Sequence, residues 1–202
     1  MVIDTPPRIR TRNLPQRPAE NDAEPGLQIR QMSREEYENL PEKPKAEWVD
    51  GKAIIMMAPA NLRHSDVVSE LLFLLKNSLP GLKIRPEAGF RYGNRDRVPD
   101  IMAVDPKKAG SGVWVTEPPE LIVEIISPAT RTQDMVTKSA EYFAAGVGQY
   151  WIVDPDLETI TVLGQGDDAW DILAELKAEN PAAEIKVGNY GTVPLNLHTV
   201  LD

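Results

Sequence analysis

The chain has 202 residues, of which 42% are hydrophobic, which is enough for one domain with a substantial core and too little for two full domains. It has no cysteine, which excludes disulfides, thiolate zinc sites and a cysteine nucleophile, and its formal net charge of −9 argues against broad electrostatic attraction to nucleic acid. It also has no run of about 18 apolar residues and no apolar stretch at its charged N-terminus, so we expect a soluble cytoplasmic protein that does not associate with membranes.

Positive charge is concentrated at the N-terminus. Residues 1–19 contain four arginines and one aspartate, whereas the rest of the chain is strongly acidic. This composition is typical of a disordered, solvated leader, which we favour over an arm that contacts phosphates. We therefore predict a flexible basic N-terminal arm over residues 1–28 and a single domain over residues 29–202.

The first half of the chain predicts two helices and a hairpin. SREE at 33–36 matches the capping box that begins a helix. The segment 46–57 has two apolar runs around Asp50-Gly51, a dipeptide favoured in tight turns, and predicts a β-hairpin. Leucines and valines recur at helical spacing through 64–81, which predicts the second helix.

Strands dominate the pattern that follows. Apolar runs separated by turn-rich segments predict strands at 83–92, 98–105 and 120–127. Helical spacing returns at 132–146, and QYWIVDP at 149–155 predicts a further strand. Strands that follow one another without a helix favour an antiparallel meander, and a helix between two strands favours a parallel pair.

The predicted fold class is α/β or α+β. Its core has the order helix, three-strand antiparallel meander, helix and strand, with an added N-terminal hairpin. LETITVLG at 157–164 is interpreted as an edge strand beside the last core strand, and the acidic tail after it receives no assignment.

Glu124 lies in the middle of the apolar run ELIVEIIS, where an unpaired carboxylate would cost several kcal/mol. If the strands at 98–105 and 120–127 are antiparallel neighbours, Asp100 and Glu124 face each other. Two carboxylates that close repel unless a cation lies between them, and a hard cation such as Mg²⁺ suits an all-oxygen site. The alternative is a structural ion pair between Glu124 and a lysine or arginine, and the residues alone favour neither reading.

Several segments resemble one known family. These are EWVDGKAIIMMAP at 47–59 followed by His64, VPD at 98–100, and ELIVEIISPATRTQDMVTKSAEYFAAGVGQYWIVDP at 120–155. They look like the Uma family of restriction endonucleases, within the PD-(D/E)XK nuclease superfamily. The resemblance implies a restriction-endonuclease-like fold and a phosphodiesterase site that depends on a divalent metal, Mg²⁺ or Mn²⁺.

The resemblance also implies roles for single residues. Asp100 matches the aspartate of the PD element and Glu124 the acidic residue of (D/E)XK, but Ile126 stands where the motif has its lysine. Lys138, on the following helix, takes the place of that lysine. The resemblance thus implies that Asp100, Glu124 and Lys138 are the catalytic residues. The expected metal ligands are Asp100, Glu124 and the backbone carbonyl of Ile125.

Further ligands and substrate contacts are weaker candidates. Glu47 resembles an upstream glutamate that completes such metal sites, although hairpin chemistry explains it equally well, and His64 is a candidate phosphate contact. Arg91, Arg95 and Arg97 lead directly into Asp100 and are candidate DNA contacts, with a solvated hairpin tip as the alternative.

The sequence thus favours an endonuclease that hydrolyses DNA phosphodiester bonds, with DNA as its partner and a homodimer as its assembly. Two alternatives remain at this point. One is a catalytically inactive interaction protein with the nuclease fold, which the missing strand lysine favours. The other is a phosphodiesterase acting on small nucleotides, for which an acidic exterior is less of a handicap.

Overall fold

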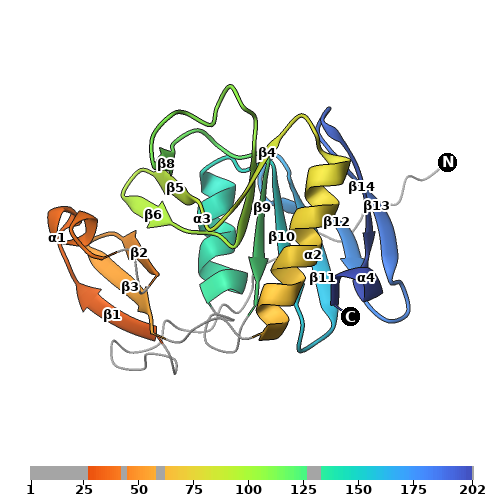
Figure 1. Cartoon of the computed structure of the whole chain (residues 1–202), viewed down its shortest axis with the longest axis horizontal. Coiled ribbons are helices and arrows are strands. Elements are labelled where there is room, and N and C mark those ends of the chain that lie inside the picture. Colours follow the sequence, from red (N-terminus) through yellow and green to blue (C-terminus); the bar gives the residue numbers. More distant parts are fainter. Residues whose placement is uncertain (1–26, 42–44, 58–61, 127–132, 202) are drawn as a thin grey trace.

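The computed structural model describes residues 27–41, 45–57, 62–126 and 133–201, and over these residues the chain forms an α+β fold with mixed sheets and more strand than helix (Figure 1). The predicted N-terminal arm lies almost entirely outside the described residues. None of the described helices is long and apolar enough to cross a membrane.

A six-stranded mixed sheet forms the centre of the fold. In spatial order its strands are β12 (Trp170–Leu176), β11 (Thr159–Gln165), β10 (Gln149–Asp154), β9 (Leu121–Ile125), β7 (Ile101–Val104) and β4 (Lys83–Pro86). β4, β7 and β9 are antiparallel to one another in turn, and β10 is parallel to β9. The meander and the parallel strand that the sequence predicts are therefore both present.

Alternate residues of the central strands pack into two different layers. On one face, Ile101 and Val123 belong to the same apolar cluster as side chains from the long helix α2 (Leu62–Ser78). That cluster also contains residues of the C-terminal elements, which are β13 (Ala182–Val187), β14 (Gly191–Asn196) and α4 (Leu197–Leu201). On the other face, Ile122 packs with Tyr142 of α3 (Ser139–Ala144). Glu124 follows Ile122 by two residues, so strand alternation directs it to the α3 face.

A second six-stranded sheet stands beside the first (Figure 1). Its strands, in spatial order, are β1 (Leu27–Gln31), β3 (Lys52–Met56), β2 (Ala46–Val49), β6 (Arg95–Arg97), β5 (Gly89–Tyr92) and β8 (Trp114–Val115). The predicted hairpin is confirmed as β2 and β3, with Asp50 (φ 47°) and Gly51 (φ 86°) both left-handed as a tight primed turn requires. The predicted capping box is also confirmed, because Ser33 and Glu36 exchange hydrogen bonds at the start of α1 (Arg34–Glu38).

One predicted strand is wrong in a way that matters for the site. The segment 83–92 is two strands in different sheets, since the chain turns at Glu87, which has a φ of 45°. The second of them, β5, then pairs with β6, a strand that the sequence did not predict. This excursion carries Arg91, Arg95 and Arg97 away from the central sheet before the chain returns to it as β7.

The C-terminal half also differs from expectation in two places. The predicted helix at 132–146 begins as a π-helix, η1 (Gln133–Lys138), continues as α3, and ends before Gly146, whose φ of 77° fits the predicted cap. The predicted edge strand, β11, is not an edge, because β12 pairs with its other side.

Candidate active site

Asp100 lies immediately before β7, at the end of the strand that adjoins β9. The register of these strands pairs Ile101 with Val123, so the next position along brings Asp100 opposite Glu124. Asp100 is also tied to the end of β9, because its Oδ2 accepts a 2.8 Å hydrogen bond from the backbone N–H of Ile125. The strand register thus brings the two predicted carboxylates to the same end of the sheet.

Glu124 is almost fully buried and is paired from the helix side. Its Oε1 accepts a 3.0 Å hydrogen bond from Lys138 Nζ and a 2.8 Å hydrogen bond from the Tyr142 hydroxyl. Lys138 and Tyr142 are four residues apart across η1 and α3, and therefore lie on one helical face. The ion-pair reading and the catalytic reading of Glu124 both require this contact with Lys138.

Glu47, on β2, joins the N-terminal sheet to the same cluster. Its Oε1 lies 3.3 Å from Lys138 Nζ and accepts a 3.0 Å hydrogen bond from the backbone N–H of Val98, while its Oε2 accepts a 2.8 Å hydrogen bond from Arg97. Lys138 therefore bridges Glu47 and Glu124, which come from different sheets.

Arg97 does not fit the predicted role of a DNA contact, because its side chain has no exposed surface. It lies between Glu47 and Glu141 of α3, with its Nε 2.7 Å from Glu141 Oε2, and so links β2 to the helix that follows Lys138. Arg91 and Arg95 are partly exposed, but each already contacts carboxylates. The buried structural role of Arg97 could not be predicted from the sequence, because a charged residue is expected at the surface.

Lys45 and His64 contact Asp100 from outside the central sheet. Lys45 Nζ lies 3.3 Å from Asp100 Oδ1, and His64 Nε2 lies 3.3 Å from Asp100 Oδ2. His64 was a sequence candidate, whereas Lys45 was missed. The signal that would have found Lys45 is its spacing of two residues from Glu47, which puts both side chains on one face of an extended segment.

The balance of burial and charge sets the protonation of this cluster. Burial raises the pKa of Asp100, but the hydrogen bond from His64 and the charge of Lys45 outweigh it, so this pKa lies well below the usual value. Burial likewise raises the pKa of Glu47, and the neighbouring lysine and arginine charges lower it to about 2. Burial lowers the pKa of Lys45, and the charge of Asp100 more than reverses this. Asp100 and Glu47 are therefore ionised at neutral pH.

The carboxylate oxygens of Asp100 and Glu124 are the kind of donor that a hard divalent cation takes. Within the described part of the chain, no three side chains of His, Cys, Asp or Glu are grouped as a metal cage. Mg²⁺ commonly binds through one or two carboxylates and keeps several waters. Asp100 and Glu124 supply two carboxylates from neighbouring strands, and the backbone N–H of Ile125, the residue after Glu124, donates to Asp100.

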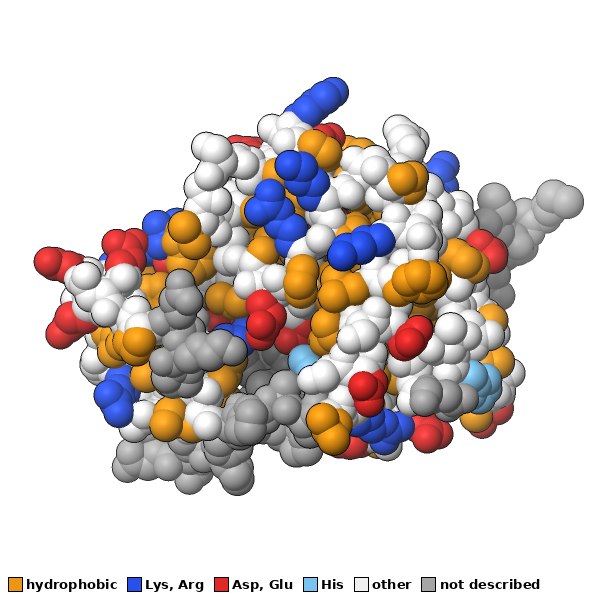
Figure 2. Space-filling view, in the orientation of Figure 1, with side chains coloured by type: hydrophobic (Ala, Val, Ile, Leu, Met, Phe, Trp, Pro, Cys, Tyr) orange, Lys and Arg blue, Asp and Glu red, His pale blue; other side chains and the backbone are white. Residues whose placement is uncertain are grey.

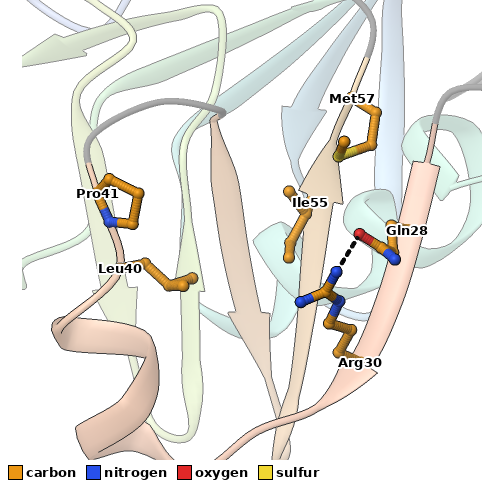
Figure 3. A pocket seen from close by; sticks show the side chains of 6 residues that line it. All are labelled: Gln28, Arg30, Leu40, Pro41, Ile55 and Met57. Carbon is orange, nitrogen blue, oxygen red and sulfur yellow. Dashed lines mark hydrogen bonds between the residues drawn. The ribbon is translucent and has the colours of Figure 1, made fainter.

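A separate depression of about 220 Å³ lies on the N-terminal sheet (Figure 3). It is lined by Gln28, Arg30, Leu40, Pro41, Ile55 and Met57. Gln28 and Arg30 hydrogen-bond to each other across a distance of 2.9 Å. No candidate site residue lines this depression, so it is distinct from the carboxylate cluster.

Both the fold and the sequence of this chain match known proteins. The fold resembles that of a crystal structure from Anabaena variabilis described as a "putative nuclease belonging to DUF820", with a TM-score of 0.69 over 83% of this chain and 96% of that chain. The sequence identity is 20%, so this likeness concerns the fold. Residues 34–185 match the Uma2 family, described as "Putative restriction endonuclease", and because the match covers more than half of the chain, the protein belongs to the Uma2 family. A search of curated proteins found no match.

Proposed function

We propose that this protein is an endonuclease that hydrolyses DNA phosphodiester bonds with Mg²⁺ or Mn²⁺ as its cofactor. The observation that carries the proposal is the register that sets Asp100 opposite Glu124, with Lys138 at 3.0 Å from Glu124. Membership of the Uma2 family supports it, as does the order of helix, antiparallel meander, helix and parallel strand, which is that of a restriction-endonuclease-like core.

Each residue of the cluster has a role in this proposal. Asp100 and Glu124 would hold the cation from two strands, with the Ile125 carbonyl and Glu47 as further oxygen donors. The bound cation would supply a Lewis acid that polarises a phosphoryl oxygen and lowers the pKa of a water. Lys138 has two roles open to it, either positioning the attacking water or holding Glu124 in orientation.

The proposal must also account for DNA binding by an acidic protein. His64 lies at the edge of the cluster and is a candidate phosphate contact, as are the partly exposed Arg91 on β5 and Arg95 on β6, the strand that leads to Asp100. A symmetric homodimer would present two such sites to the two strands of a duplex. A few such phosphate contacts near the site would allow DNA binding even though the protein carries a net negative charge.

Plasmid nicking tests the proposal. We expect the wild type to nick supercoiled DNA with Mg²⁺ or Mn²⁺ and to stop when EDTA is added, and Glu124→Gln to lose activity by about 100-fold or more. Glu70→Gln, on the exposed side of α2, is the matched control and should retain full activity.

Three results would contradict the proposal, and two of them point to a different function. Hydrolysis of a dinucleotide phosphodiester without plasmid nicking would indicate an enzyme of small nucleotides. No hydrolysis of either substrate by the folded wild type would indicate a non-catalytic protein. Full nicking activity in Glu124→Gln would show that Glu124 is not part of the active site.

A further inference from the structure

The charged groups of the cluster differ in their access to solvent. Among the side chains, the exposed fraction is 1% for Glu47, 3% for Glu124, 4% for Lys138, 10% for Asp100, 19% for His64 and 25% for Lys45. The cluster therefore has a closed side around Lys138 and an open side at His64 and Lys45. Figure 2 shows acidic, basic and histidine side chains together where the surface is hollowed between the N-terminal strands and α2.

Lys138 lies on the closed side of the cluster, where it contacts two buried carboxylates. A lysine ammonium has three N–H donors, and Lys138 directs its charge to Glu124 at 3.0 Å and to Glu47 at 3.3 Å. Its side chain is nearly without exposed surface, so a phosphate that arrives from solvent meets other groups first. Moving Lys138 to such a phosphate would leave two buried carboxylates without this cation, which is costly.

Lys45 has the opposite properties. Its hydrogen bond to Asp100 Oδ1 is 3.3 Å long, which is long for a charge-assisted bond, and the next carboxylate, Glu87, is 3.8 Å away and largely exposed. Its four-carbon stem is flexible, and its side chain is the most exposed among those of the cluster compared above. A rotation of that stem would bring the ammonium to a phosphate placed beside Asp100.

We propose that Lys45 is the lysine that contacts the substrate phosphate, and that Lys138 is a positioning residue that holds Glu124 and Glu47. The inference rests on the proposed function and refines it. It gives the site a cation on its more exposed side, which β9 does not supply because Ile126 stands where the motif has its lysine. It also assigns to Lys138 the second of the two roles open to it.

The test measures DNA binding and cleavage in variants of the two lysines. Binding of a labelled duplex of about 20 base pairs is followed with Ca²⁺ at salt concentrations from about 50 to about 200 mM, because each phosphate contact contributes about one unit to the slope of log K against log salt. Lys45→Met should weaken binding about tenfold and reduce this slope by about one unit, and Lys45→Arg should restore both. Lys138→Met should leave the slope unchanged.

Two further readouts separate the roles and control for folding. At a temperature where every variant remains folded, Lys45→Met should raise KM, whereas Lys138→Met should lower kcat with KM unchanged. Lys76→Met is the matched control, since Lys76 is exposed on α2 about 18 Å along the helix from His64. It should alter neither binding nor kinetics.

The outcomes distinguish this inference from the function on which it rests. If Lys45→Met keeps the affinity and slope of the wild type while Lys138→Met loses a unit of slope, the inference is overturned and the endonuclease proposal stands. If the wild type binds no duplex at the lowest salt concentration, the endonuclease proposal falls, and the role of Lys45 falls with it.

Discussion

Replacing Arg97 by methionine should destabilise the fold by about 3 kcal/mol. Arg97 is fully buried and donates to Glu47 at 2.8 Å and to Glu141 at 2.7 Å. Removing one member of a buried ion pair costs roughly 3–5 kcal/mol, because the remaining charge stays in a poorly solvating environment. We expect the lower end of this range, since Glu47 retains Lys138 and Glu141 retains Arg95, each at 3.3 Å.

Urea denaturation at neutral pH, followed by tryptophan fluorescence, measures this loss, and the thermal midpoint should fall by about 6–12 °C. Arg63→Met is the matched control, because Arg63 is 46% exposed and 3.8 Å from an exposed glutamate, so its loss should cost less than about 1 kcal/mol. If Arg97→Met is as stable as this control, the link between β2 and α3 does not hold the site together as described.

Two smaller predictions concern pH and the hairpin. The pKa of Glu47 falls from its ordinary value of 4.5 to about 2 in the folded protein, so its contribution to stability is complete above pH 4.5 and is lost as the pH falls toward 2. Glu47→Gln should therefore show a shallower loss of stability over this window, and an unchanged acid limb would contradict the charge pairing. Gly51→Ala should destabilise the β2–β3 turn by about 1 kcal/mol, because Gly51 has a φ of 86°, whereas Gly112→Ala, on an exposed loop with ordinary φ, should be nearly neutral in thermal unfolding. Equal stability of the two glycine variants would argue against the strained turn.

The parts of the fold that the sequence predicts are those with local signals. Asp50-Gly51 specifies its own turn, SREE caps its own helix, and the three buried strands are recognisable as apolar runs. The bend at Glu87 carries no such signal, because a glutamate with positive φ is held by the surrounding structure and not by its own preference. β12 was not predicted, because its adjacent apolar residues Ile172 and Leu173 break the alternation of apolar and polar residues that is typical of a half-buried strand. In the structure both side chains are exposed.

The site divides in the same way. Asp100 and Glu124 could be brought together from sequence, because antiparallel neighbours fix which residues face each other. Arg97 could not be placed, because its partners Glu47 and Glu141 lie on elements distant in sequence, and a charged residue in isolation predicts a surface position. Lys45 could have been found only through its spacing of two residues from Glu47, since its partner Asp100 is distant in sequence. The family resemblance pointed to Lys138, and the structure adds that this lysine also contacts Glu47.

We propose that Asp100 and Glu124 together hold a divalent metal. Calorimetric titration of Mn²⁺ into the wild type, Asp100→Asn and Glu124→Gln tests it most directly, with thermal unfolding recorded for each to establish that the variants are folded. We expect the wild type to bind one Mn²⁺ and both folded variants to bind none. Absence of binding in the wild type, or binding that both variants retain, would contradict a shared metal site and would leave Glu124 as a buried structural partner of Lys138 and Tyr142.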